Sequence, residues 1–323
     1  MVAGFLCALW MWLLVAQSSG QLRTHLPAIP LGTDSPAVAS PPLLTLPFQY
    51  QKRHIYLIGS INGHPGMVLL LDSGSSESGL DVHTAQALRL APGPMKNADI
   101  GLGDGAAFVA SPIRVRIGLG PLSLSQKMLL VELSGLEQVS GQRIDGILGA
   151  PFFKRYVVEL NFHTHILKVF APAHYQPRPQ DTPIPISMKH NVPIVASTLF
   201  FGVNQRLTAD LELDTGSDDT LLLYRSFEEK HHLQRKIPWT GTGTGYGLGG
   251  KYNVELCTLG AVRVGTIQAN RLDIAFSTAN HGVSAKSRMD GEIGNGLLEK
   301  TRTVIVDVPD RELFFEWKAP RPR

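Results

Sequence analysis

The chain has 323 residues, of which 43% are hydrophobic and 18% are charged. This length allows about two domains, and the apolar content is enough to form cores, so the composition excludes a disordered chain. The formal net charge is only +3 and no long basic run occurs, which argues against a nucleic-acid partner. The 32 glycines and 22 prolines favour a turn-rich β protein over a helical one.

The chain begins with an apolar run from Met1 to Ala16, and small residues follow as far as Gly20. The run is shorter than the roughly 20 apolar residues that cross a bilayer, so residues 1–20 are interpreted as a signal peptide. We therefore expect an exported protein, secreted or periplasmic, with no stable membrane insertion. The usual positive charge before the apolar run is missing, which leaves an uncleaved anchor or a mis-assigned start as alternatives.

Two proline-rich segments divide the rest of the chain. Residues 21–47 are interpreted as an extended leader, and residues 171–187 as a linker between two bodies of similar size. This division places an N-terminal lobe at 48–170 and a C-terminal lobe at 188–318.

Apolar and alternating runs predict mostly strands in both lobes. In the first lobe the expected strands are 54–61, 67–71, 114–118, 122–124, 157–162 and 166–170, with a hairpin turn at 62–66 and a helix at 82–90. In the second lobe they are 194–201, 207–213, 304–308 and 313–315, with a turn at 202–204 and a helix at 224–233. The chain is therefore predicted to be all-β with a few short helices.

The two lobes repeat each other in two motifs. Asp72-Ser73-Gly74-Ser75 in the first lobe corresponds to Asp214-Thr215-Gly216-Ser217 in the second, and each follows an apolar strand. Further on, Asp145-Gly-Ile-Leu-Gly149 corresponds to Asp290-Gly-Glu-Ile-Gly294 at nearly the same interval. Each lobe then ends in a predicted pair of strands. A period this long indicates a duplicated domain rather than a solenoid.

The two aspartates carry the chemistry that the sequence predicts. Burying a lone carboxylate at the end of an apolar strand is costly, and a capped turn explains a single Asp-Ser-Gly equally well. Two copies in a duplicated chain instead favour a site. If Asp72 and Asp214 meet, they share a proton and titrate in two separate steps. One then acts as a base and the other as an acid, which activates a water and protonates a carbonyl or a leaving nitrogen.

These motifs resemble the active-site motifs of pepsin-like and retropepsin-like aspartic peptidases. Ile147-Leu148-Gly149 resembles the hydrophobic-hydrophobic-glycine motif that supports the active-site loop in that family. The short interval between the aspartates resembles two fused retropepsin-like units, as in bacterial tandem proteins of this group. The resemblance implies a bilobal aspartic-protease fold, in which two homologous β-barrel-like lobes have the active-site cleft between them.

The resemblance also implies an aspartic endopeptidase in which Asp72 and Asp214 hold the nucleophilic water. It assigns supporting roles to the residues beside them: cross-linking of the loops by Ser73 and Thr215, hydrogen bonds to the outer carboxylate oxygens from Ser75 and Ser217, and close approach of the loops at Gly74 and Gly216. The implied substrate is a peptide or protein bound in extended conformation, with no cofactor and no metal. A monomer is expected, because one chain then holds both aspartates.

Glycine-rich stretches at 101–105 and 241–250 are the candidate flaps over the substrate, and Tyr246 is the candidate flap tyrosine. A surface hairpin loop is the alternative for this second stretch.

One departure from the family pattern is Glu292, which stands where an apolar residue is usual. We expect it either to displace the second loop or to face solvent. Acidic residues after the motifs, Glu77, Asp218 and Asp219, are expected to raise the pKa of the dyad and to extend activity above strongly acidic pH.

Two other interpretations stay open. The protein is alternatively a peptide- or ligand-binding protein that keeps the lobes and has lost catalysis, or each lobe pairs with a lobe of another chain.

Residues 245–250 match a dinucleotide-binding glycine pattern, but a strand follows instead of a helix. Neither pair of neighbouring histidines, at 163 and 165 or at 231 and 232, has metal-binding spacing, and no serine lies in a Gly-x-Ser-x-Gly elbow.

Overall fold

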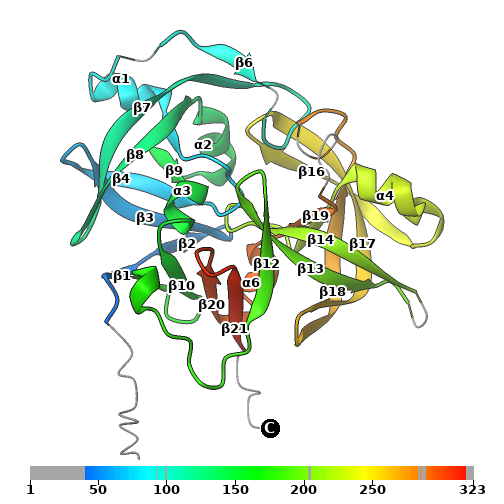
Figure 1. Ribbon diagram of the computed structural model, residues 1–323. Helices are drawn as coiled ribbons and strands as arrows, with labels where there is room; N and C mark the ends of the chain where they lie inside the picture. Colours follow the sequence, from blue (N-terminus) through cyan, green and yellow to red (C-terminus); the bar gives the residue numbers. More distant parts are fainter. Residues whose placement is uncertain are drawn as a thin grey trace, which may run out of the picture. The chain divides into compact units, whose positions relative to one another are not determined.

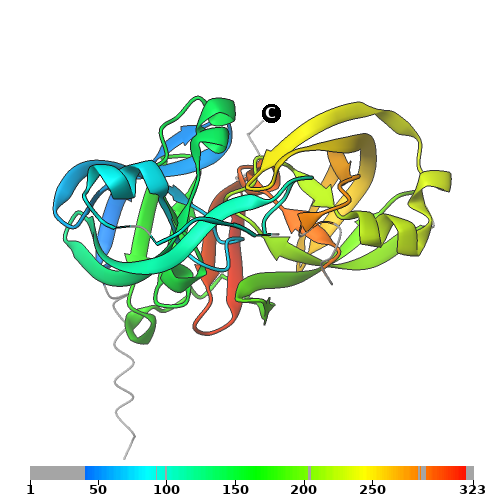
Figure 2. The same ribbon diagram turned by 90° about the horizontal axis from the view of Figure 1, so that it is seen from above.

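The computed structural model describes residues 41–317, except 92, 99, 203, 204, 283 and 285–288. All of them belong to one compact unit, residues 39–323. Strands dominate and the helices are short, so the predicted all-β fold with two lobes is confirmed (Figures 1 and 2). No helix in the described part of the chain is long and apolar enough to span a bilayer. The predicted signal peptide, 1–20, and most of the predicted leader lie outside the described residues.

The first lobe is built on an eight-stranded sheet. Its strands in space run β2-β3-β4-β9-β5-β8-β7-β6. Their bounds are β2 (Gln49–Gln51), β3 (His54–Ile61), β4 (His64–Leu71), β5 (Gly79–Asp81), β6 (Lys96–Ala98), β7 (Ala107–Leu119), β8 (Leu122–Val131) and β9 (Gly146–Leu148). Its helices are α1 (Val82–Ala87), α2 (Ser134–Ser140) and α3 (Ala150–Phe153). The sequence did not predict α2, and α1 is shorter than the helix expected at 82–90.

The second lobe repeats the strand order of the first, as β12-β13-β14-β19-β15-β18-β17-β16. The bounds are β12 (Ile184–Lys189), β13 (Val192–Phe200), β14 (Arg206–Leu213), β15 (Leu221–Leu223), β16 (Trp239–Gly247), β17 (Gly250–Val264), β18 (Ile267–Ser277) and β19 (Gly291–Ile293). Its helices are α4 (Arg225–His231), the 3₁₀ turn η2 (Leu233–Arg235) and α6 (Asn295–Leu298). In both lobes the strand before the aspartate pairs in parallel with the strand of the second motif.

Turn chemistry fixes the first hairpin. Asn62 and Gly63 have φ values of 50° and 88°, as a two-residue hairpin turn between β3 and β4 requires. The turn is therefore shorter than the predicted 62–66, and Pro65 lies within β4, where a register shift at Gly59/Ser60 accommodates it.

The strand pairs that end the lobes do not close each lobe separately. β10 (Val157–Asn161) of the first lobe pairs in antiparallel fashion with β20 (Thr301–Asp307) of the second. With β1 (Leu44–Pro47), β11 (Ile166–Phe170) and β21 (Glu312–Trp317) they form an interlobe sheet, which continues through β12 into the second lobe. β10, β20 and β21 lie between the lobes in both ribbon views (Figures 1 and 2). A continuous apolar core extends from one lobe through this sheet to the other.

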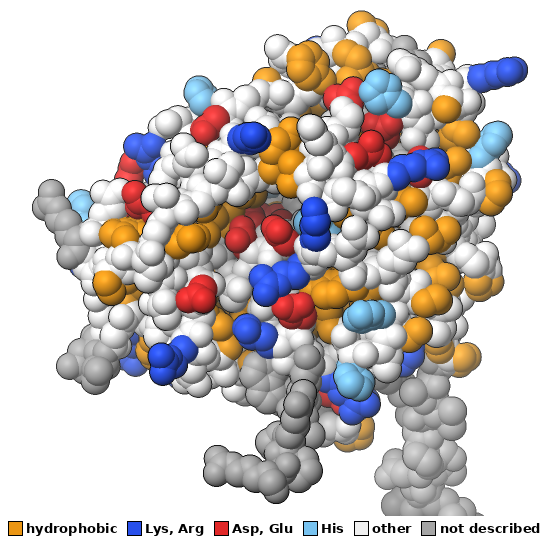
Figure 3. Space-filling model, turned by 180° about the vertical axis from the view of Figure 1, so that it is seen from behind, with side chains coloured by type: hydrophobic (Ala, Val, Ile, Leu, Met, Phe, Trp, Pro, Cys, Tyr) orange, Lys and Arg blue, Asp and Glu red, His pale blue; other side chains and the backbone are white. Residues whose placement is uncertain are grey.

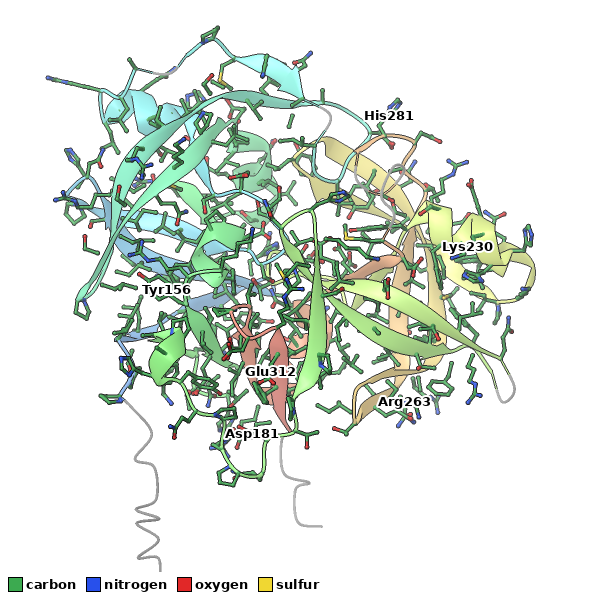
Figure 4. The ribbon with its side chains drawn as sticks, in the orientation of Figure 1. Tyr156, Asp181, Lys230, Arg263, His281 and Glu312 are labelled. Carbon is green, nitrogen blue, oxygen red and sulfur yellow. The ribbon has the colours of Figure 1, made fainter. Side chains whose placement is uncertain are left out.

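Two predicted boundaries differ from the structure for the same reason. Residues 44–47, assigned to the leader, form β1, and Leu44 is buried in the core. The predicted linker, 171–187, contains the short turn η1 (Pro172–His174) and the first residues of β12. Arg178 fixes the linker, because it binds Asp181 at 2.9 Å and Glu316 of β21 at 3.1 Å. Figure 4 shows Asp181 near the end of β21, the strand that carries Glu312. Proline marks both segments as extended, but extended segments also join sheet edges.

The interlobe sheet predicts the effect of a core substitution. Leu160 of β10 is fully buried between Leu167 and Val304. Leu160→Ala should lower the free energy of unfolding by about 2–5 kcal/mol, because it leaves a cavity between the lobes. Urea unfolding measures the loss. Leu160→Met keeps the volume and should cost less than about 1.5 kcal/mol; equal losses for the two variants would contradict the assignment of this residue to the shared core.

Candidate active site

The two aspartates occupy equivalent places at the ends of β4 and β14. The Asp72 N–H donates to the Leu148 carbonyl at 3.0 Å, and the Asp214 N–H donates to the Ile293 carbonyl at 2.9 Å. Each loop is held a second time just beyond the motif, by Ala150 N–H to Ser75 O and by Asn295 N–H to Ser217 O, both at 2.8 Å. The second motif of each lobe thus supports the loop that carries the aspartate of that lobe.

Ser73 and Thr215 join the two loops. The Ser73 hydroxyl donates to the Leu213 carbonyl at 2.5 Å and accepts from the Thr215 N–H at 3.0 Å. The Thr215 hydroxyl donates to the Leu71 carbonyl and accepts from the Ser73 N–H, each at 2.9 Å. Both residues are completely buried. This reciprocal set of four hydrogen bonds fixes the two loops against each other across the lobes.

Glycine is required at positions 74 and 216 because the opposite aspartate fills the space. A Cβ built on Gly74 would lie 2.5 Å from Cγ of Asp214, and one on Gly216 would lie 2.4 Å from Cγ of Asp72. Both distances are far below a van der Waals contact. The glycines therefore allow the loops to approach closely enough for each aspartate to reach the other loop.

The two carboxyl groups lie within hydrogen-bonding reach of each other. Burial, the negative charge of Asp214 and the hydrogen bond between them raise the pKa of Asp72 well above its usual value. Burial also raises the pKa of Asp214, but the N–H of Gly216, which donates to its Oδ1 at 2.7 Å, opposes the rise. The two groups therefore titrate as one coupled pair, and a single proton is shared between the two carboxyl groups.

Ser75 and Ser217 do not bind the carboxylates as predicted. The Ser75 hydroxyl donates to the Glu77 carbonyl at 2.8 Å, while its backbone N–H donates to Oδ1 of Asp72 at 2.8 Å. The Ser217 hydroxyl accepts from the Asp219 N–H at 3.3 Å. The tight turn brings backbone N–H groups to the aspartates, so the serine hydroxyls are free to hold the following residues.

The dyad faces a cavity of about 450 Å³ between the lobes. Figure 3, which shows the molecule from behind, has a hollow near the centre of the surface, and acidic side chains lie in it beside hydrophobic ones. The walls include Leu70 and Ile147 from the first lobe, and Tyr224 and Tyr252 from the second. The described residues contain no group of three or more His, Cys, Asp or Glu side chains able to hold a metal ion.

Glu292 neither displaces the loop nor faces solvent, so both expectations for it are wrong. It is 2% exposed, lines the cavity, and its Oε2 accepts from the Tyr224 hydroxyl at 3.0 Å. Glu212 is its partner on the neighbouring strand and is 4% exposed. Burial first, and then the charge of Asp214, raise the pKa of both glutamates.

The sequence pattern did not identify Glu212 as a residue of the site. In Leu211-Glu212-Leu213 the alternation of apolar and polar residues resembles the solvent face of a strand. The available signal was the comparison with Leu69-Leu70-Leu71, in which the equivalent residue is apolar and no polar face exists. His54 was also missed: it lines the cavity, its Nδ1 is buried with no hydrogen-bond partner among the described residues, and its charge lowers the pKa of Asp214.

Glu77, Asp218 and Asp219, which were expected to raise the pKa of the dyad, are not among the main causes of the shifts of Asp72 and Asp214. Glu77 is exposed. Burial and the neighbouring Asp218 raise the pKa of Asp219 to about 7, so the charge of that side chain changes near neutral pH.

The two candidate flaps meet each other over the cavity. The N–H groups of Asp104 and Gly105 donate to the carbonyls of Lys251 and Gly249, at 3.1 and 2.8 Å, and the Gly249 N–H donates to Leu102 O at 2.7 Å. The loop at 278–282 adds a bond from Asn280 N–H to Asp104 Oδ1 at 2.9 Å, and Figure 4 shows His281 on this loop beside the first lobe. Because the tips come from different lobes, their bonds must break or shift when a substrate enters.

Tyr246 lies in the β16–β17 hairpin and lines the cavity. Its hydroxyl reaches α2 of the first lobe, where a Cβ on Gly135 would lie 2.3 Å from it. The predicted flap tyrosine thus spans from the second lobe to the first.

A comparison with protein families supports the assignment of the first lobe as an aspartic-protease lobe. Residues 57–152 match the family model described as "Aspartyl protease", and this range contains Asp72 and Ile147-Leu148-Gly149. No curated protein sequence matches the chain.

The loop junction gives a stability prediction. Thr215→Ala removes a hydroxyl and leaves the Ser73 N–H and the Leu71 carbonyl buried without a partner. The free energy of unfolding, measured with urea, should fall by roughly 2–4 kcal/mol. Thr215→Ser retains the hydroxyl and should lose less than half of that amount; a serine variant as unstable as the alanine variant would show that the hydroxyl is not what joins the loops.

The buried glutamates predict how stability depends on pH. Folding raises the pKa of Glu292, so its contribution to stability is complete below its ordinary value of 4.5 and is lost as pH rises through the folded pKa. The loss is about 1.4 kcal/mol for each unit of pKa increase. Glu292→Gln should therefore unfold at higher urea than wild type near pH 7, and the difference should vanish near pH 4.

The matched control is Glu77→Gln, because Glu77 is exposed beside the other aspartate. Its unfolding midpoint should follow that of wild type at both pH values. If the midpoint of Glu292→Gln also follows that of wild type at both pH values, the burial of Glu292 does not destabilise the protein.

Proposed function

We propose that the protein is an aspartic endopeptidase with Asp72 and Asp214 as its catalytic dyad, which is the activity suggested by the match of residues 57–152 to the aspartyl protease family model. The observation that carries the proposal is the mutual approach of these two carboxyl groups, one from each lobe, at the floor of a cleft. A pair that shares one proton has both an acid and a base ready at the same place.

The pKa of Asp72 is raised more than that of Asp214, which supports Asp72 as the acid and Asp214 as the base of the pair. Asp214, the ionised member, removes a proton from a water molecule as the water oxygen attacks the carbonyl carbon of the peptide. Asp72, which holds the proton of the pair, donates it to the carbonyl oxygen, and a tetrahedral diol forms. When the C–N bond breaks, the proton on Asp214 passes to the leaving nitrogen and a diol hydroxyl returns its proton to Asp72. The products are an acid and an amine, and the dyad is restored.

The cleft is suited to an extended peptide. Strand edges and flap hairpins from both lobes surround the cavity, so a peptide entering beneath the flaps meets backbone groups on either side. The flap tips, bonded to each other over the cavity, would exclude water around the dyad once the substrate is bound.

The proposal also includes the oligomeric state and the location of the protein. A single chain supplies both aspartates, which supports a monomeric enzyme rather than lobes paired between chains. The apolar start of the sequence supports export, to the periplasm or the medium. A binding protein without catalysis remains the contrasting function, and the flap contact gives it one physical basis, because flaps that do not open prevent turnover.

Activity against an unfolded protein separates the two functions. The purified full chain should cleave denatured casein between about pH 3 and 7, as followed by mass spectrometry of the products. Asp72→Asn removes the acid and Asp214→Asn the base, and each should lower the rate by at least about 10³-fold. A wild type as inert as both variants would refute the peptidase.

Glu312→Gln is the matched control for a carboxylate-to-amide change, since Glu312 lies on β21 outside the cavity. It should retain the wild-type rate.

Because the pKa of Asp72 is raised, its proton is kept as pH increases beyond the usual range of an aspartate, so the rate should remain measurable well above pH 4. An optimum near pH 3 with no activity by pH 5 would contradict the raised pKa.

A further inference from the structure

The two lobes present different side chains at equivalent positions in the cleft. In the first lobe, Leu70 of β4 pairs with Ile147 of β9, and both line the cavity. In the second lobe, Glu212 of β14 pairs with Glu292 of β19, and these also line it. The repeated topology therefore exchanges an apolar pair for an acidic pair at the same structural place.

The acidic pair has no salt-bridge partner among the described residues, and Tyr224 donates to only one oxygen of Glu292. Oε1 of Glu292 is buried and has no hydrogen-bond partner among the described residues. In the same part of the chain, no salt bridge involves either Glu212 or Glu292. Of the described lysines and arginines, Lys52 lines the cavity, but its Nζ donates to the Val139 carbonyl of the first lobe at 2.8 Å. Two buried carboxylates without a counter-charge are costly, so the site is suited to a cation supplied by a ligand.

The position of the pair indicates which part of a substrate would supply the cation. Glu212 lies two residues before Asp214, so both side chains project from the same face of the chain. Residues two apart on a strand are separated by roughly 7 Å. A substrate side chain that reaches Glu212 therefore belongs to a residue directly beside the bond at the dyad.

The walls suit a long side chain with a charged end. The second-lobe side of the cavity is lined by the buried rings of Tyr224 and Tyr252 and by the side chain of Val254, which together offer apolar surface. Methylene groups of lysine or arginine can pack on such surfaces while the charged group reaches the carboxylates. A metal ion is a poorer occupant, because the described residues offer no cluster of three ligands.

We propose that Glu212 and Glu292 form the base of a specificity subsite that takes a lysine or arginine side chain next to the cleaved peptide bond, on the second-lobe side of the dyad. The inference rests on the proposed peptidase function and adds a substrate class to it: proteins and peptides with basic residues. The pair acts on substrate choice, because a neutral substrate side chain leaves both buried carboxylates without a counter-charge.

The first experiment uses the wild-type full chain. Cleavage sites in denatured casein, mapped by mass spectrometry at about pH 6, should be enriched in lysine and arginine at one of the two positions flanking the cut. Matched peptides that differ only at this position should then show a kcat/KM at least about tenfold higher for lysine than for norleucine. A ratio near one overturns the subsite while leaving the peptidase intact.

Substitutions test whether the glutamates cause the preference. The double variant Glu212→Leu with Glu292→Ile copies the first-lobe pair, and its lysine-to-norleucine ratio should fall below one. The isosteric double variant Glu212→Gln with Glu292→Gln should bring the ratio close to one. Glu312→Gln should keep the wild-type ratio. A preference that survives both double variants overturns the proposal.

A binding measurement keeps this inference separate from catalysis. Asp72→Asn, which cannot turn over, is titrated with the same peptides by calorimetry. Tighter binding of the lysine peptide, lost when both glutamates are also changed to glutamine, supports the subsite even where wild type cleaves nothing; in that case the peptidase proposal fails alone. Equal binding of the two peptides overturns the subsite.

Discussion

The approach of two buried carboxyl groups, Asp72 and Asp214, is the constraint on which the rest of the structure depends. Such a pair is unfavourable, because burial and like charge both oppose ionisation. The fold offsets this cost with a rigid frame: the hydroxyls of Ser73 and Thr215 join the loops, and backbone N–H groups serve the carboxylates. Sharing one proton removes the remaining repulsion.

The frame is held from two sides. Below the loops, β10 and β20 join the lobes in one sheet, so the separation of the aspartates is set by strand pairing rather than by a flexible linker. Above them, the flap tips of the two lobes bond to each other. The lobes are thus fixed at the base and connected by a few backbone hydrogen bonds at the top, where opening requires the least disruption.

The lobes differ in the charge of equivalent positions in the cleft. Strand order and the supporting motifs repeat, but the pair Leu70 and Ile147 corresponds to Glu212 and Glu292. A symmetric dyad can bind and cut a peptide without distinguishing its two directions. Charge on one side gives the cleft a direction, and it also places two further titratable groups next to Asp214.

The sequence by itself determined the all-β class, the two lobes and the repeated motifs, because alternation, turn residues and the Asp-Ser/Thr-Gly pattern are local signals. Strand 54–61 was predicted with its correct bounds for this reason. Tertiary structure alone decided the interlobe sheet, the bond partners of Ser75 and Ser217, and the burial of Glu212 and Glu292 in the cleft. Periodicity tells which side chains share a face of a strand, but what covers that face depends on the partner that packs against it. Leu-Glu-Leu therefore looks like a solvated strand in the sequence and becomes the acidic floor of a cavity only when the second lobe folds.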